Sequence, residues 1–268
     1  MPPQSHTQAR FPDDFVAGVL DEALANGVRV QGIAGLQGSG KSTLAAQVAA
    51  LARERGLQAL ALSIDDFYLP RRERLALGRR VHPLLATRGP PGSHDVKLAC
   101  GTLDALRAGR PTALPRFDKL GDRRLPPSRW TKVTRAPDLI VFDGWFLKVP
   151  PEPTAALAEP LNALERQADP TGYWRTWCNA ALKAYAPLWR RIDRLLFLHG
   201  PGFEIVPEWR WQQEQALHAA QPARAAMDRR AVARFVMAFE RVSRQALHTL
   251  PAIAQRSVRL DAQRRLLC

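Results

Sequence analysis

The run GIAGLQGSGKSTL, at positions 32–44, constrains the fold more than any other part of the sequence. It matches the pattern G-x-x-x-x-G-K-[ST], with glycines at Gly35 and Gly40 and then Lys41 and Ser42. Residues 28–34 before the motif form a short β-branched run, and residues 41–55 have a helical pattern. A glycine-rich turn between a strand and a helix predicts a phosphate-binding loop, because its backbone N–H groups can all point inward.

Each residue type in this loop has a physical role at a phosphate chain. Lys41 is expected to reach the β- and γ-phosphates of ATP, and the Ser42 hydroxyl is expected to bind Mg²⁺. The N-terminal end of the following helix attracts negative charge. An ordinary glycine-rich turn with an incidental lysine is the alternative, but it does not account for both flanking elements. The predicted ATP-binding residues are Gly35, Leu36, Gln37, Gly38, Ser39, Gly40, Lys41, Ser42 and Thr43.

Acidic residues follow two other apolar runs. SIDDFYL places Asp65 and Asp66 at the end of a predicted strand, at the edge where open α/β sheets bind ligands. An Asp there can align an attacking hydroxyl and accept its proton, or, as the simpler alternative, cap a helix. DLIVFDGW resembles a Walker B strand, so Asp143 is predicted to bind Mg²⁺ directly or through water. The alternative for Asp143 is an Asp-Gly turn.

Five apolar runs predict parallel strands with helices between them. The predicted fold is therefore a P-loop NTPase of three α/β/α layers, with a five-stranded parallel sheet, in a single domain over residues 1–268. The predicted strands are residues 28–34, 57–64, 138–142, 193–199 and 257–260.

Two segments lack a clear periodic pattern. Residues 69–92 and 111–137 are rich in Pro and charged residues, so we expect irregular structure, with one short helix in the first. Ser93 is expected to cap the helix that follows, and Asp228 is expected to cap a long helix near the C-terminus.

Composition bears on partners and location. The net charge is +14, but arginine pairs are spread along the whole chain, which favours a solvated basic surface over a single basic groove. We therefore expect no nucleic-acid partner. No apolar run is long enough for a membrane span and the first residues lack a signal-peptide pattern, so we expect no membrane partner and a cytoplasmic location. The sequence does not predict an oligomeric state.

Three cysteines with no framework spacing are expected to be reduced thiols: Cys100, Cys178 and Cys268.

Together these motifs resemble the D-glycerate 3-kinase family of P-loop kinases, which is similar to uridine kinase and pantothenate kinase. The resemblance implies ATP-dependent phosphorylation of a small hydroxy acid, glycerate giving 3-phosphoglycerate, on a P-loop kinase fold with a helical lid. It covers nearly the whole chain through motifs in the same order: GLQGSGKST, SIDDFYL, HPLLATRGPPGSHD, LPRFDK with GDR, LIVFDGW, WRWQQE and MDRRAVARFV.

The resemblance also implies roles for side chains outside the phosphate loop. Asp65 would engage the acceptor hydroxyl, and Arg210 on the lid would neutralise the transferred phosphoryl group. A guanidinium is a natural partner for the acceptor's carboxylate, and Arg88, Arg116 and Arg123 are the candidates. Trp209 and Trp211 are expected to pack, and the turn after residue 260 is expected to lie near the adenine. The implied acceptor-site residues are Asp66, Tyr68, Arg88, His94, Asp95, Arg116, Asp118 and Lys119.

Two features depart from the family pattern. Only Leu120 separates Lys119 from Gly121, where the family has a longer glycine-rich insert, and Asp143 stands where the family commonly has Glu. Two alternatives therefore stay open. One is a nucleoside or pantothenate-type kinase, and the other is a P-loop ATPase stimulated by nucleic acid.

Overall fold

The computed structural model describes residues 10–220 and 227–267. Its strands are β1 (Val30–Gly35), β2 (Ala59–Ser63), β3 (Thr112–Leu114), β4 (Phe117–Asp118), β5 (Arg123–Arg124), β6 (Thr131–Val133), β7 (Leu139–Gly144), β8 (Arg194–His199), β9 (Arg256–Leu260) and β10 (Leu266–Leu267). Its α-helices are α1 (Asp13–Ala25), α2 (Lys41–Glu54), α3 (Arg71–Arg80), α4 (Val96–Arg107), α5 (Ala163–Ala168), α6 (Tyr173–Ala181), α7 (Ala186–Trp189), α8 (Val206–Ala220) and α9 (Arg229–Ile253). Short 3-10 turns are η1 (Ile64–Phe67), η2 (Pro83–Ala86), η3 (Pro127–Arg129), η4 (Thr154–Leu157), η5 (Leu182–Tyr185) and η6 (Phe203–Ile205).

The central sheet has six strands in the order β10-β9-β8-β1-β7-β2. The five predicted strands are all present and parallel, so the α/β fold class is confirmed. The sixth strand, β10, corrects the expected count of five. It runs antiparallel to β9 and was missed because two residues are too short to show an alternating pattern.

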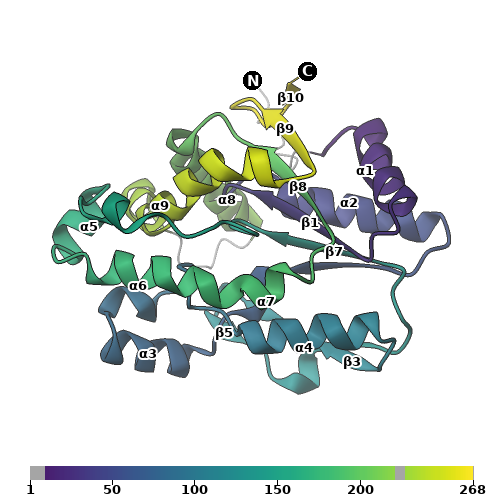
Figure 1. Cartoon of the computed structure of the whole chain (residues 1–268), viewed down its shortest axis with the longest axis horizontal. Helices are drawn as coiled ribbons and strands as arrows, with labels where there is room; N and C mark the ends of the chain where they lie inside the picture. Colours follow the sequence, from purple (N-terminus) through teal and green to yellow (C-terminus); the bar gives the residue numbers. More distant parts are fainter. Residues whose placement is uncertain (1–9, 221–226, 268) are drawn as a thin grey trace.

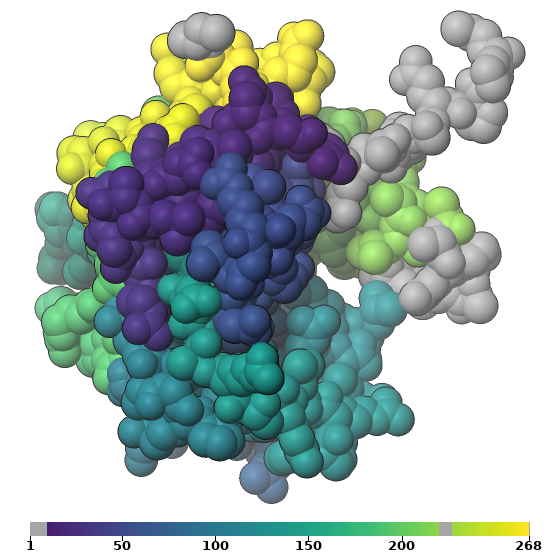
Figure 2. Space-filling view, turned by 90° about the vertical axis from the view of Figure 1, so that its right-hand side faces the viewer, coloured from purple at the N-terminus to yellow at the C-terminus, as the bar shows by residue number. Residues whose placement is uncertain are grey.

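Helices cover both faces of this sheet (Figure 1). Apolar residues of α1 and α2 pack on one face around Ile33, Val141 and Leu196. Residues of α4, α7 and α9 pack on the other face, around Ala34, Ile140 and Phe197. Because both faces are covered, every residue of β1 and β7 is buried, which explains their continuous apolar runs. Figure 2 shows α1 in purple beside α2 in blue on the outside of the first face.

The strand register brings the ends of three strands together. In the ladders, Asp143 of β7 lies opposite both Ile33 of β1 and Ser63 of β2. Gly35, the last residue of β1, lies opposite Leu198 of β8. The loop after β1, the acids after β2 and the acid near the end of β7 therefore meet at one edge of the sheet.

The two segments expected to be irregular contain more structure than predicted. Residues 69–92 include the expected short helix, α3, and the turn η2. Residues 111–137 form two small antiparallel ribbons, in which β3 pairs with β6 and β4 pairs with β5. Strands of two or three residues in a Pro-rich and charged segment give no periodic signal, so sequence reasoning missed them.

One helix cap was assigned to the wrong residue. Asp95 caps α4, because its carboxylate accepts a hydrogen bond from the N–H of Leu98 at 3.0 Å. The predicted cap, Ser93, is buried and donates instead to the carbonyl of Pro90 at 2.6 Å. The predicted cap of α9 is confirmed, since the Asp228 carboxylate accepts from the N–H of Ala231.

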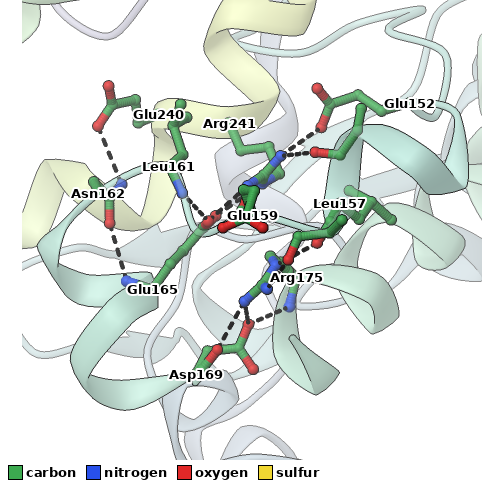
Figure 3. Close-up of polar contacts among 12 residues, drawn as sticks. Glu152, Leu157, Glu159, Leu161, Asn162, Glu165, Asp169, Arg175, Glu240 and Arg241 are labelled. Carbon is green, nitrogen blue, oxygen red and sulfur yellow. Dashed lines mark hydrogen bonds and ion pairs between the residues drawn. The ribbon is translucent and has the colours of Figure 1, made fainter. Parts of the chain in front are cut away.

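A buried polar network joins the segment between β7 and β8 to α9 (Figure 3). Arg241 of α9 contacts both carboxylate oxygens of Glu165, at 2.9 and 2.7 Å. Asn162 caps α5 and also donates to the carbonyl of Met237 on α9. Nearby, Arg175 pairs with the buried Asp169 at 3.1 Å. The network holds the segment between β7 and β8 against α9.

Two other expectations bear on location. Cys100 and Cys178 are free thiols, whereas Cys268 lies outside the described residues. Within residues 10–220 and 227–267, no helix combines the length and the apolar character that a membrane crossing needs.

Candidate active site

The loop between β1 and α2 has the backbone shape of a phosphate cradle. Gly38 and Gly40 have φ of 81° and 91°, a region that favours glycine. A Cβ on Gly38 would lie 2.5 Å from the Cβ of Trp209, so α8 also requires glycine here. Lys41 begins α2, and its Nζ lies 3.4 Å from the carbonyl oxygen of Leu36 in the same loop. Burial lowers the pKa of Lys41, although the charges of Asp143 and Asp65 oppose that effect.

Three oxygen-bearing side chains converge beside the loop. Ser42 Oγ donates to Asp143 Oδ1 at 2.9 Å, and Ser63 Oγ lies 3.3 Å from the same oxygen. Asp143 is 3% exposed, and burial raises its pKa to about 6 despite the nearby charge of Lys41. Ser63 was missed in the sequence because a serine at a strand end carries no motif of its own.

This oxygen set fits a hard divalent cation that also binds phosphate. Within the described part of the chain, no three His, Cys, Asp or Glu side chains are grouped to hold a metal by themselves. Mg²⁺ is commonly held by one or two carboxylates together with substrate phosphates and water, which agrees with Ser42 and Asp143 beside a phosphate loop. The metal roles of these two residues stay predictions.

Asp65 lies on η1, directly after β2. Its side chain is 24% exposed, and its Oδ2 accepts a hydrogen bond from Lys119 Nζ at 2.6 Å. Burial opposes ionisation, but the charges of Lys119 and Lys41 outweigh it and hold the pKa of Asp65 below its ordinary value. The helix-cap alternative for these acids is wrong, because Ser63 caps η1 by accepting from the N–H of Asp65. Asp65 is thus ionised and lies between cations.

Asp66 contacts β4 and the residue directly before that strand. Its Oδ1 accepts from the N–H of Phe117 at 3.1 Å, and its Oδ2 lies 3.7 Å from Arg116 Nη1. Burial raises the pKa of Asp66. Asp66 therefore ties η1 to the short ribbon that carries Lys119.

An aromatic cluster lies next to these acids. The rings of Tyr68 and His94 stack at 4.3 Å, and the Tyr68 ring contacts Phe117 at 5.3 Å. His94 Nδ1 lies 2.8 Å from the Tyr185 hydroxyl, and burial lowers the pKa of His94 to about 3. Its Nε2 has no hydrogen-bond partner among the residues that the structure describes, so a bound acceptor could provide one.

Three other implied acceptor residues have structural partners instead. Arg88 pairs with Asp122 at 2.7 Å, and Asp118 accepts from two backbone N–H groups of its own turn, those of Leu120 and Gly121. Asp95 caps α4 and also pairs with Arg124 at 3.2 Å. These three side chains are thus engaged by other protein groups. Arg116, Lys119 and Arg123, in contrast, have exposed side chains.

The α8 helix lies against the phosphate loop. Trp209 is fully buried, as expected for a packing residue, and its indole N–H donates to the carbonyl of Ala262 at 2.8 Å. Arg210 pairs with Glu214 at 2.9 Å and lies 5.9 Å from the Phe235 ring, so it is held on the helix in this structure. Its proposed role as a lid cation stays a prediction.

Sequence reasoning missed several residues that organise the site. Fully buried Arg74 donates to the carbonyls of Leu69 and Ala86 and pairs with Asp122 at 2.8 Å. Arg264 donates to the carbonyl of Gly38 at 2.5 Å and lies over the Trp209 ring. The chain is rich in arginine, so no local signal distinguishes these two from surface arginines.

Comparisons with known proteins agree with this arrangement. No protein-family model matches the sequence. An uncharacterized kinase of Schizosaccharomyces pombe is 32% identical over 200 residues, which are 71% of this chain and 71% of the relative. The chloroplastic D-glycerate 3-kinase of Arabidopsis thaliana is 32% identical over 236 residues, covering 83% of this chain and 48% of the plant protein. The prediction of a cytoplasmic location stays a prediction.

A solved structure agrees with the fold. The D-glycerate 3-kinase of Cryptococcus neoformans var. grubii superposes with a TM-score of 0.76 at 23% identity, over 95% of this chain and 96% of that one. The fold and the relatives identify an enzyme that transfers a phosphoryl group, and a P-loop kinase fold implies ATP and a divalent metal. The chain belongs to the D-glycerate 3-kinase family of P-loop kinases.

Proposed function

We propose that this kinase transfers the γ-phosphoryl group of ATP to a hydroxyl of a small hydroxy acid, with D-glycerate giving 3-phosphoglycerate. The observation that carries the proposal is the position of Asp65 between cations of two different segments. On one side is Lys41 of the phosphate loop, and on the other is Lys119, beside exposed Arg116. An ionised acid next to a phosphate loop can align a hydroxyl, and cations beyond it suit a carboxylate. The name of the Arabidopsis relative supports the choice of glycerate.

In the proposed reaction, the hydroxyl oxygen forms a bond to the γ-phosphorus while the bond from that phosphorus to the β-phosphate oxygen breaks. The hydroxyl proton passes to the Asp65 carboxylate and then to solvent, and ADP leaves. A low pKa suits Asp65 for positioning, because phosphoryl transfer has a loose transition state that needs little proton removal beforehand. Lys41 and Arg210 would stabilise the charge on the transferred group.

The nucleotide would lie along residues 35–43. Backbone N–H groups of the loop and the first turn of α2 would contact its phosphates. Ser42 and Asp143 would hold Mg²⁺, which would neutralise phosphate charge, and Ser63 would support Asp143 through their hydrogen-bonding contact. The turn at residues 261–265 would border the adenine, since it contacts both the loop and α8.

The acceptor would lie between η1 and the β4–β5 ribbon. Of the three arginines considered, Arg88 already pairs with Asp122, whereas Arg116 and Arg123 have exposed side chains near Asp66 and Asp118. We therefore favour Arg116, which approaches Asp66 directly next to Asp65, as the guanidinium that contacts the acceptor's carboxylate. Tyr68 and His94 would form the wall of this pocket.

Product identification by mass spectrometry tests the proposal. The purified protein is incubated with Mg-ATP and, separately, with D-glycerate, L-glycerate, glycerol, pantothenate or uridine. We expect a phosphorylated product from D-glycerate at a rate well above that from the other acceptors. A preference for uridine or pantothenate would replace glycerate with the corresponding acceptor while leaving the kinase assignment in place.

A further inference from the structure

Lys119 occupies the carboxylate that the proposed mechanism needs. Its ammonium donates to Asp65 Oδ2 at 2.6 Å, and this is the only ion pair of Asp65 within the described residues. Charge attraction to Asp65 also raises the pKa of Lys119, so the pair is a full ion pair near neutral pH. A hydroxyl or water molecule that approaches Oδ2 of Asp65 must compete with this ammonium.

The backbone around Lys119 is held firmly. At the base of the ribbon, Phe117 donates to Asp66 and Arg124 donates to the carbonyl of Tyr68 at 2.8 Å. At its tip, Asp122 is fixed by Arg74 and Arg88. These contacts anchor the ribbon at its base and at its tip.

The Lys119 side chain itself is different. It is 56% exposed on a flexible four-carbon stem, and its hydrogen bond to Asp65 holds only the terminal atom. Rotation about the side-chain bonds is therefore enough to move the ammonium away from Asp65, without any change in the ribbon. The two-carbon to three-carbon skeleton of a small hydroxy acid would keep its carboxylate only a few bonds from the hydroxyl that Asp65 aligns.

We propose that Lys119 selects acceptors by their charge. Its ammonium blocks Asp65 in the free kinase and moves to the carboxylate of the acceptor when a hydroxy acid binds. This inference rests on the proposed function and assigns its substrate class more narrowly, to alcohols that carry an anionic group. An acceptor without a negative charge leaves the ammonium on Asp65. Water is excluded in the same way, so ATP is not hydrolysed while the acceptor site is empty.

The test uses ADP release by the full-length Lys119→Met variant. Without acceptor, freed Asp65 can align water; its oxygen bonds to the γ-phosphorus, the bond to ADP breaks and a proton passes to Asp65, giving inorganic phosphate. Because general-base assistance contributes roughly 10²–10⁴-fold, we expect acceptor-free hydrolysis to rise about tenfold or more. The KM for D-glycerate should also rise about tenfold, and the preference for D-glycerate over glycerol should fall.

Lys132→Met is the matched control, since Lys132 is an exposed lysine on β6 of the neighbouring ribbon. It should behave as wild type, and Lys119→Arg should restore much of the suppression because it keeps the cation. Melting curves and Mg-ADP titration establish that each variant is folded, and Lys119→Gln repeats the test with a polar side chain. Acceptor-free hydrolysis at the wild-type rate in both neutral variants would overturn the proposal.

The outcomes separate the two proposals. If wild type phosphorylates none of the hydroxy acids, the proposed function fails, while a rise in acceptor-free hydrolysis in Lys119→Met still supports the block on Asp65. If wild type phosphorylates D-glycerate and Lys119→Met changes neither the hydrolysis rate nor the KM, the function stands and the role of Lys119 is wrong.

Discussion

Ser42 Oγ donates a hydrogen bond to Asp143 Oδ1 at 2.9 Å, which joins the first turn of α2 to the end of the adjacent strand β7. The two residues come from motifs about a hundred positions apart in the chain. Their contact places a hydroxyl and a carboxylate side by side at the mouth of the phosphate loop, where a phosphate-bound cation would meet both.

Asp143→Asn should weaken the binding of the metal by the enzyme. The amide keeps the size of the side chain but removes the charge, so we expect the Mg²⁺ concentration for half-maximal activity to rise by about 10-fold to 100-fold. Activity measured over a Mg²⁺ titration checks this. Asp138→Asn is the control and should follow the wild-type curve, because Asp138 is an exposed residue directly before the other end of β7. Equal curves for both variants would remove Asp143 from the metal site.

Asp65→Asn should abolish most turnover while leaving nucleotide binding nearly intact. An amide cannot accept the hydroxyl proton, so kcat should fall by about 10²-fold or more. Single-turnover product formation and calorimetric titration with Mg-ADP measure the two properties separately. If the Asn variant turned over at the wild-type rate, the role of Asp65 would be wrong.

The stability of the metal-free protein should depend on the pH through Asp143. Burial raises the pKa of this carboxyl from 3.8 to about 6, so the folded chain holds the proton to higher pH than the unfolded chain does. The stabilisation is present below about pH 4 and is lost as the pH rises through about 6. Urea unfolding in chelator should show wild type losing roughly 3 kcal/mol relative to Asp143→Asn across this range. If the difference in free energy of unfolding between the two proteins did not change with pH, the raised pKa of Asp143 would be contradicted.

Gly38→Ala should impair both folding stability and nucleotide affinity. The new Cβ would lie 2.5 Å from Trp209 Cβ, on a backbone with φ of 81°. Gly56→Ala is a matched control, because Gly56 has φ of 83° and no atom within 4 Å of the new Cβ. The control should cost about 1–2 kcal/mol, the conformational penalty alone. Gly38→Ala should lower the free energy of unfolding, measured in urea, by clearly more than the control does, and it should weaken Mg-ADP binding. Equal losses in the two variants would mean that the loop adjusts to the new Cβ at no extra cost.

Arg241→Met should destabilise the protein by about 3 kcal/mol, since it leaves the buried Glu165 carboxylate without its guanidinium. Arg230→Met, an exposed position on the same helix, is expected to change the free energy of unfolding by less than about 0.5 kcal/mol. Urea unfolding of both variants gives the comparison. A small effect of Arg241→Met would indicate that the segment between β7 and β8 is held mainly by its apolar contacts.

Local patterns predicted the fold and the centre of the site. The phosphate loop follows β1 and Asp143 lies in β7, and both strands are buried on both faces, so they appear in the sequence as unbroken apolar runs. Asp65 follows the edge strand β2, which is still a mostly apolar run. The chemistry expected at the sheet edge could therefore be located from residues close to one another in the chain. The register of the parallel strands then brings Ser63, Asp143 and the loop together.

The remaining features depend on contacts between distant segments. Lys119 reaches Asp65 only because two-residue strands fold a Pro-rich segment back on itself, and such strands have no periodicity. Asp95 and Ser93 are both good caps two positions apart, and the burial of Ser93 decides between them. Arg74 and Arg264 resemble the many surface arginines until the fold surrounds them.

The anchoring of Trp209 limits how the lid can close. Its indole is tied to Ala262 and its Cβ lies against Gly38, so in a closing movement the start of α8 would be the pivot and the rest of the helix would move about it. Displacement grows with distance from that point. Arg210, the next residue, would be carried only slightly by such a swing and must approach the nucleotide through rotation of its own side chain.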